Sequence, residues 1–242
     1  MKEFITRCVL LLFLTWMGKS VVAQSTNDRM ATRDSILKET EFGSVYVTRD
    51  RTAKMYDWLA PRVYDSTELK SVFDEEFINE LLNDGAVTVQ HVENDLIQGD
   101  WCSLYYFEGQ FYVYSPSDWM FAERILITDS AFIKTCCADL DLRFIENYDV
   151  LKDGSLQFTL SDYFDQKRQL NIAFIDPDHT VSMWTCRYDD GTDYCAIKVR
   201  AEFVRAYDMI VNDCGDRKCF QEFVFEMPGI NEMRTQWSKN QD

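Results

Sequence analysis

The feature that most limits how this chain can fold is a set of three tight-turn dipeptides, Glu108-Gly109, Asp153-Gly154 and Asp190-Gly191. Each separates two runs rich in Val, Ile, Phe, Tyr and Thr, which is the pattern of a β-hairpin. Further runs of this composition lie at 86–92, 123–128, 131–136, 142–150, 156–160, 169–175 and 180–188. Consecutive hairpins predict an antiparallel meander, and the pattern leaves open whether the meander closes as a barrel or packs as a sandwich.

The region before this meander has helical patterns. Asp65-Ser66 can cap a helix over residues 67–83, where apolar residues recur at helical spacing. A shorter helix is expected over residues 51–60, and it must end near Pro61 because the residue before a proline disfavours helical geometry. Residues 201–212 return to helical spacing, either as a helix packed on the sheet or as the end of a long strand.

These patterns divide the chain into four parts. Residues 1–23 are expected to be a signal peptide and residues 24–85 a helical segment that packs on the β domain. Residues 86–227 form the antiparallel β domain, and residues 228–242 form a polar tail. The predicted fold class is therefore mainly β (α+β), with one or two helices before the meander.

The first 23 residues have the three parts of a cleaved secretory signal. Lys2 and Arg7 precede an apolar run at 8–18, and small residues up to Ala23 precede a polar stretch. The run is too short for a membrane-spanning helix, which needs ~20 residues. Its cysteine, Cys8, lies at the front of the run and cannot become a lipidated N-terminus. We therefore expect a periplasmic or secreted protein that is not a lipoprotein and has no membrane span after signal cleavage.

The chain is acidic, with 25 Lys and Arg against 41 Asp and Glu and a formal net charge of −16. A basic surface for a phosphate backbone is therefore missing, and we expect no nucleic-acid partner. The sequence holds no Asn-x-Ser/Thr site, which favours a bacterial envelope or extracellular origin.

An oxidising compartment predicts that the cysteines after the signal form disulfides. If Asp190-Gly191 forms a two-residue type I′ turn, Cys186 lies directly opposite Cys195. The Cα atoms of such a pair would be ~4.5 Å apart, a separation that a disulfide can bridge. The sequence therefore predicts a Cys186–Cys195 bridge.

The other cysteines are expected to provide two further bridges. Cys214 and Cys219 bracket a short polar loop and are predicted to pair. Cys102 is expected to pair with Cys136 or Cys137, which leaves one thiol and an open choice between them. No Cys-x-x-Cys is present and only two histidines occur, so no metal site is predicted.

The Glu108-Gly109 hairpin carries the candidate binding site. One face is a plausible core stripe, made of Cys102, Leu104, Tyr106, Phe111 and Val113. The other face carries the candidate residues Trp101, Tyr105, Tyr112 and Tyr114. Tyrosine and tryptophan combine apolar area with a hydrogen-bonding tip, which suits a sugar ring or a protein partner. The alternative is that this face is a second packed layer, for instance beneath the N-terminal helix.

Gly99-Asp100-Trp101 resembles the Gly-x-Trp that opens the first strand of lipocalin-like barrels. The resemblance covers three residues only. It implies a barrel with an interior ligand site that begins at this point of the chain.

No Gly-x-Ser-x-Gly, His-Glu-x-x-His, Walker loop or Gly-x-Gly-x-x-Gly is present, so no catalytic residue and no cofactor is predicted. We expect an exported, disulfide-stapled, soluble and non-enzymatic module that binds a small molecule, a glycan or an envelope protein. The alternative is a secreted glycan hydrolase that uses two carboxylates. A structural role in a surface assembly is a third possibility.

Overall fold

The computed structural model describes residues 34–40, 43–61, 89–118, 122–136, 139–162, 166–187, 193–214 and 222–239. Contacts separate the chain into residues 1–30 and residues 31–242, and every described residue belongs to the second unit. That unit is mainly β, as the sequence predicts. No helix in its described ranges has the length and apolar character needed to cross a bilayer.

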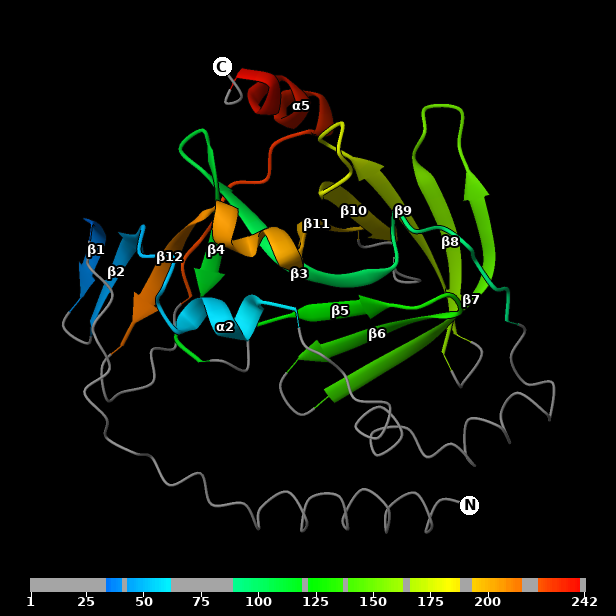
Figure 1. The fold of residues 1–242 in the computed structure, drawn as a ribbon, viewed down its shortest axis with the longest axis horizontal. Helices are drawn as coiled ribbons and strands as arrows, with labels where there is room; N and C mark the ends of the chain where they lie inside the picture. The colour runs from blue at the N-terminus through cyan, green and yellow to red at the C-terminus, as the bar shows by residue number, and fades with distance from the viewer. Residues whose placement is uncertain are drawn as a thin grey trace, which may run out of the picture. The chain divides into compact units, whose positions relative to one another are not determined.

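Eight antiparallel strands form a closed barrel (Figure 1). They are β3 (Gly99–Phe107), β5 (Arg124–Ile127), β6 (Ala131–Cys136), β7 (Asp139–Val150), β8 (Leu156–Ser161), β9 (Lys167–Phe174), β10 (Val181–Arg187) and β11 (Asp193–Arg200). Strands β5 to β11 follow one another as a meander, and β3 closes the ring by pairing with both β5 and β11. The predicted meander is confirmed, and it is a barrel rather than a sandwich.

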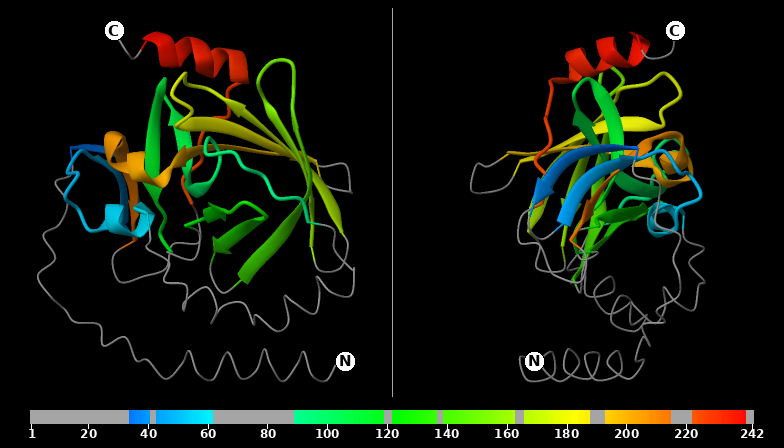
Figure 2. Two further views of the ribbon diagram at one scale, coloured as in Figure 1. Left: turned by 45° about the vertical axis from the view of Figure 1, so that its right-hand side comes forward. Right: turned by 90° about the vertical axis from the view of Figure 1, so that its left-hand side faces the viewer.

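A second sheet continues from β3 beyond the barrel. It contains β4 (Gln110–Ser115), β12 (Asp208–Asp213), β2 (Gly43–Thr48) and β1 (Ser35–Thr40), which lies at the edge. The pairing of β12 with β4 is parallel, whereas the other pairs are antiparallel. Figure 2 shows this sheet beside the barrel, with β1 and β2 in blue and β12 in orange.

The helices are short. Helix α2 (Met55–Leu59) lies inside the predicted range 51–60, and Ala60 is extended as expected of a residue before Pro61. The helix predicted over 67–83 lies outside the described residues. Residues 35–40 and 43–48, expected in a helical segment, form β1 and β2, so one described helix precedes the barrel.

Two segments after the meander also differ from their sequence patterns. Residues 201–212 combine both options: a 3₁₀ helix, η2 (Ala201–Ala206), is followed by β12. Helix α5 (Ile230–Lys239) forms within the expected polar tail, because Met233 on one of its faces is fully buried in the core. The strand expected at 86–92 is absent from its described part, residues 89–92.

The predicted register of the β10–β11 hairpin is wrong by one residue. The strands end at the pair Arg187 and Asp193, which leaves the odd number of five residues between them. A two-residue turn would need an even number, and a slip of one residue turns a side chain to the other face. Cys186 therefore pairs with Tyr194, while Cys195 pairs with Thr185. Both cysteines are free thiols, so the Cys186–Cys195 bridge is not formed.

The remaining cysteines are only partly described. Cys102 is a free thiol whose S–H donates to the Leu59 carbonyl oxygen at 3.1 Å, so the expected bridge to Cys136 or Cys137 is not formed. Burial raises the pKa of this thiol to about 11. Cys214 is disulfide-bonded, but its predicted partner Cys219 lies outside the described residues, so this pairing stays a prediction.

Aromatic rings from non-adjacent strands meet inside the barrel. Trp184 on β10 lies 5.8 Å from Trp101 on β3 and 6.0 Å from Phe132 on β6, measured between ring centroids. Phe132 also lies 5.1 Å from Phe158 on β8. Strands that are not neighbours can share such contacts only through the interior, so this cluster fills the centre of the barrel.

The outer wall of the barrel is buried as well. Outward-facing residues of β3, β10 and β11, such as Leu104, Val181 and Ile197, pack in one core with residues of α2, η2 and α5. Figure 2 shows α5 in red across one end of the barrel. There Arg234 donates to the Phe174 carbonyl oxygen at the end of β9.

The first and last strands of the barrel are joined by a cation–π contact. The Arg200 guanidinium lies 5.3 Å from the centre of the Trp101 ring and donates to the carbonyl oxygens of Gln98 and Asp95. The indole N–H of Trp101 donates to the Ile97 carbonyl oxygen at 2.7 Å. Gly99-Asp100-Trp101 thus opens the first strand of the barrel, as the resemblance implies.

We expect Arg200→Met to lower the free energy of unfolding by about 2–4 kcal/mol, because it removes two charge-assisted hydrogen bonds and the cation–π contact. Urea unfolding measures this change. Arg187→Met, which removes an exposed ion pair with Asp193 on the same hairpin, is the control and should cost much less. Equal losses in the two variants would show that closure does not depend on Arg200.

Candidate functional site

One end of the barrel interior is polar. Trp101 pairs with Arg200, and two residues further along the same strands Ser103 pairs with Lys198. Because alternate residues of a strand share a face, Ser103 and Lys198 also point inward. Lys198 is fully buried, and its ammonium nitrogen lies 6.0 Å from the centre of the Trp184 ring. A charged group therefore lies directly beside the aromatic cluster.

The carboxylate of Glu123, just before β5, organises this end. Its oxygens accept hydrogen bonds from Lys198, from Ser103 at 3.3 Å and from Tyr194 at 3.2 Å. Lys134 on β6 completes the group, with its ammonium nitrogen 2.8 Å from the second carboxylate oxygen. Four side chains from β3, β6 and β11 thus meet on one acid.

The pKa values follow from burial and pairing. Burial alone would raise the pKa of Glu123, but the charges of Lys198 and Lys134 and their hydrogen bonds outweigh it and lower the pKa to about 2. Burial lowers the pKa of Lys198, and Glu123 offsets this effect only in part. The Glu123 carboxyl group is therefore ionised at neutral pH and can bind all four side chains as a carboxylate.

A second group of charges lies on β7, β8 and β9 at the same end. The Arg143 Nε donates to Asp141 at 3.1 Å, and one terminal nitrogen of Arg143 lies 3.9 Å from Asp162. Arg168 approaches Asp141 to 4.0 Å. The register pairs Asp141 with Lys134 and Leu160 with Arg168, so both groups belong to the interior face.

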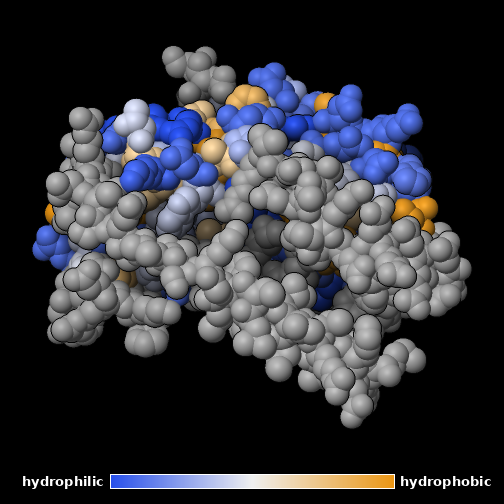
Figure 3. Space-filling model, turned by 60° about the horizontal axis from the view of Figure 1, so that its bottom comes forward, coloured by the Kyte–Doolittle hydropathy of each residue, from blue (hydrophilic) through white to orange (hydrophobic). Residues whose placement is uncertain are grey.

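The two ends of the barrel differ in chemistry. The β7–β8 turn lies at the top of Figure 1, so the polar end faces downward. Figure 3 shows the molecule with this lower side brought forward, and strongly hydrophilic side chains are visible in recesses of the surface. At the opposite end the interior holds mostly apolar side chains and the Trp101–Arg200 contact, and α5 is attached to β9.

The residues of the predicted aromatic face are separated by the structure. Trp101 lies inside the barrel, fully buried. Tyr105 and Tyr114 lie in the second sheet, 5.4 Å apart, and both contact Phe225. Tyr112 is half-buried nearby and donates to Gln110 at 3.1 Å. The three tyrosines thus belong to one layer, covered in part by residues 222–226, and Trp101 to another.

Sequence reasoning missed the interior charges. The signal is present, since Arg143 and Lys198 each stand within an alternating run of apolar strand residues. Alternation marks two faces of a strand, but it does not tell which face is the inside of a closed barrel.

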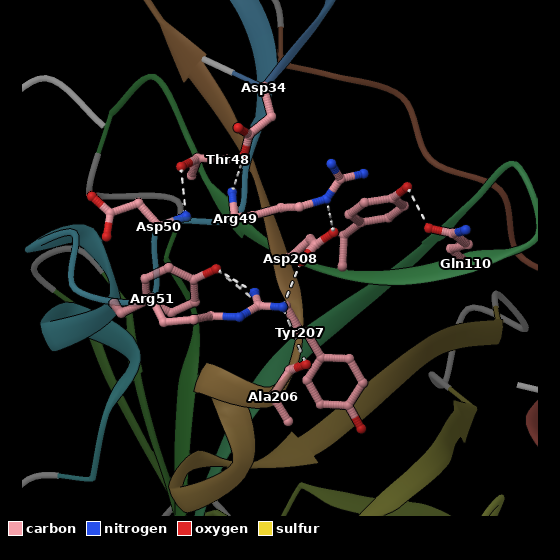
Figure 4. Close-up of polar contacts among 11 residues, drawn as sticks. Asp34, Thr48, Arg49, Asp50, Arg51, Gln110, Ala206, Tyr207 and Asp208 are labelled. Atoms are coloured by element: carbon pink, nitrogen blue, oxygen red, sulfur yellow. Dashed lines mark hydrogen bonds and ion pairs between the residues drawn. The ribbon is translucent and has the colours of Figure 1, made fainter. Parts of the chain in front are cut away.

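Another polar cluster joins β2, α2 and β12 (Figure 4). Asp208 accepts from Arg51 at 2.5 Å and from Arg49 at 3.3 Å, and Arg51 also donates to the Tyr56 hydroxyl at 2.8 Å. The Tyr56 hydroxyl donates in turn to the Tyr207 carbonyl oxygen at 2.9 Å. These groups satisfy one another, which is the arrangement of a structural clamp.

An open groove of about 460 Å³ lies between α5 and the turns of the apolar end, beside His179 and Trp237. Its polar groups are also engaged within the protein. Asp176 accepts from the backbone N–H groups of Thr180 and Val181, and Arg234 binds the Phe174 carbonyl. The polar end of the barrel is therefore the better candidate site.

Comparison with known proteins assigns no function to this site. No family model matches the chain, and neither a curated protein nor a solved structure is detectably similar to it.

Glu123→Gln should lower the free energy of unfolding by roughly 3 kcal/mol at pH 7, because the carboxylate has a pKa of about 2 when folded and 4.5 ordinarily. A lowered carboxyl pKa stabilises the folded state above pH 4.5. This stabilisation is lost as the pH falls from 4.5 towards 2. Urea unfolding from pH 7 to pH 3 should show the two proteins converging. Glu93→Gln, at an exposed position, is the control, and a constant gap between wild type and Glu123→Gln would contradict the assignment.

Proposed function

We propose that this protein is a non-enzymatic binding module whose ligand is held at the polar end of the barrel interior. The observation that carries the proposal is Lys198, a fully buried ammonium group held by Glu123 and Ser103. Apolar side chains would fill the same space at a lower desolvation cost. Charges buried in a barrel interior beside an aromatic cluster are more typical of a binding site than of a core.

The interior favours a small molecule over the other two expected partners, a glycan and an envelope protein. An eight-stranded barrel holds side chains or one small ligand, and another protein cannot enter it. Charged groups lie at one end and the indoles of Trp101 and Trp184 lie beyond them. This order suits a molecule with a polar head and an apolar body.

Export fits this proposal. The signal pattern in residues 1–23 supports a periplasmic or secreted location, and the disulfide-bonded Cys214 is compatible with an oxidising compartment. A bacterial binding module in the envelope or outside the cell remains the proposed setting.

A carboxylate-dependent glycan hydrolase is the alternative. Such an enzyme needs one carboxyl group that stays protonated near neutral pH to act as the general acid. Glu123 has its pKa lowered to about 2, and Asp141 and Asp162 both lie against Arg143. These ion pairs favour binding over hydrolysis.

Thermal unfolding of the protein in the presence of fatty acids, bile acids, neutral lipids and oligosaccharides tests the proposal. A ligand at ~100 times its dissociation constant adds about 2.7 kcal/mol, which raises the melting temperature by a few degrees. We expect such a shift for molecules with a polar head and an apolar body, and none for oligosaccharides.

Lys198→Met is the matched variant, since Met fills the channel of the Lys side chain without its charge. It should fold and lose the shift. Lys152→Met, at an exposed position in the β7–β8 turn, should keep it. A flat panel for the wild type would contradict the proposal, and equal shifts in both variants would place the ligand elsewhere.

A further inference from the structure

One inward-facing cation of the polar end lacks a partner for a buried donor. The Arg143 side chain is 10% exposed, and its Nε is bonded to Asp141. One terminal nitrogen is buried and makes no hydrogen bond to any residue that the structure describes, since its contact with Asp162, at 3.9 Å, is too long for one. A buried donor on a charged group is costly to leave unpaired, so an acceptor is expected there.

The other inward-facing cations described above differ in this respect. Lys198 has Ser103 and Glu123, and Arg200 has two backbone carbonyls. Arg124 also leaves buried nitrogens without hydrogen bonds, but it faces outward, pairs with Asp100 at 3.4 Å and donates to the Trp58 carbonyl. Among the inward-facing cations that the structure describes, Arg143 is thus the one with a buried nitrogen that makes no hydrogen bond.

The surroundings of Arg143 are cationic on one side and apolar on the other. Arg168 lies against the same Asp141, whose partner in the register is Lys134. On the neighbouring strand β6, the register partner of Arg143 is Phe132, and the Phe132 ring contacts Trp184 and Phe158. The unpaired donor therefore lies at the border between the charges and the aromatic cluster.

We infer that Arg143, with Arg168 and Lys134 beside it, binds the anionic head of an amphiphile whose apolar body extends toward Phe132 and Trp184. Guanidinium offers donors only, and a carboxylate or a similar oxyanion matches its planar fork. An alkyl or ring body would replace water next to the aromatic side chains. This inference rests on the proposed function and names the class of ligand for the same site.

Titrations followed by tryptophan fluorescence, with dodecanoate and with dodecanol, separate the head group from the body. The two probes share the chain length and differ in charge. We expect the protein to bind dodecanoate about tenfold or more tightly than dodecanol. Inorganic phosphate alone should bind more weakly than dodecanoate, since it lacks an apolar body.

Arg143→Gln should remove the preference for dodecanoate and leave the affinity for dodecanol unchanged. Arg187→Gln removes an equal charge from the outward face of β10 and should keep the preference for dodecanoate. If Arg143→Gln fails to fold, Arg168→Gln asks the same question and should weaken dodecanoate binding selectively.

Four outcomes would overturn the inference. Equal binding of dodecanoate and dodecanol, or an equal loss of both in Arg143→Gln, would mean that the site does not recognise the charge, while the proposed function would stand. If phosphate bound as tightly as dodecanoate, the apolar body would not contribute to affinity, and the ligand would not need to be an amphiphile. Binding of neither dodecanoate nor dodecanol would contradict the inference directly, and the ligand panel would then decide the proposed function.

Discussion

The structure depends on β3, because this strand closes the barrel. Residues 99–102 pair with β5, residues 101–104 pair with β11, and residues 105–107 leave to begin the second sheet. Trp101 is paired on both sides, with Ile125 and with Arg200. A closed ring fixes which face of every strand is inside, so the position of each interior charge follows from this pairing.

Closure also explains how much of the fold the sequence could predict. The meander and two of the three turn dipeptides were accessible because they are local: Glu108 and Gly109, between β3 and β4, both have positive φ, as a type I′ turn requires, and Gly154 has a φ of 80°. The parallel pairing of β12 with β4 joins segments about a hundred residues apart, and no local sequence pattern predicts this pairing. Strands β1 and β2 were missed although they form a local hairpin, because the partner that attaches β2 to the rest of the sheet, β12, lies far along the chain.

The site was harder to predict than the fold. Both faces of the β3 wall are buried, since Cys102 and Leu104 pack outward beneath other elements while Trp101 packs inward. Hydrophobicity therefore gave no sign of which face was the interior. An aromatic face on the hairpin was a reasonable prediction from composition, but Tyr105 and Tyr114 lie in the second sheet with Phe225. In a closed barrel, the more informative residues are charged ones at inward positions.

Among the described residues of the polar end, hydrogen-bond donors outnumber the acceptors that are still available. This imbalance favours a ligand that brings acceptors of its own. Lysine and arginine offer donors only, and the acid that could balance them, Glu123, already receives Lys198, Lys134, Ser103 and Tyr194. Asp141 lies against two guanidinium groups, those of Arg143 and Arg168. These contacts hold the lysines in place and engage the carboxylates of Glu123 and Asp141, while Asp162 lies 3.9 Å from the unbonded nitrogen of Arg143. An occupant that brings its own oxygens is the simplest way to complete the hydrogen bonding of this end.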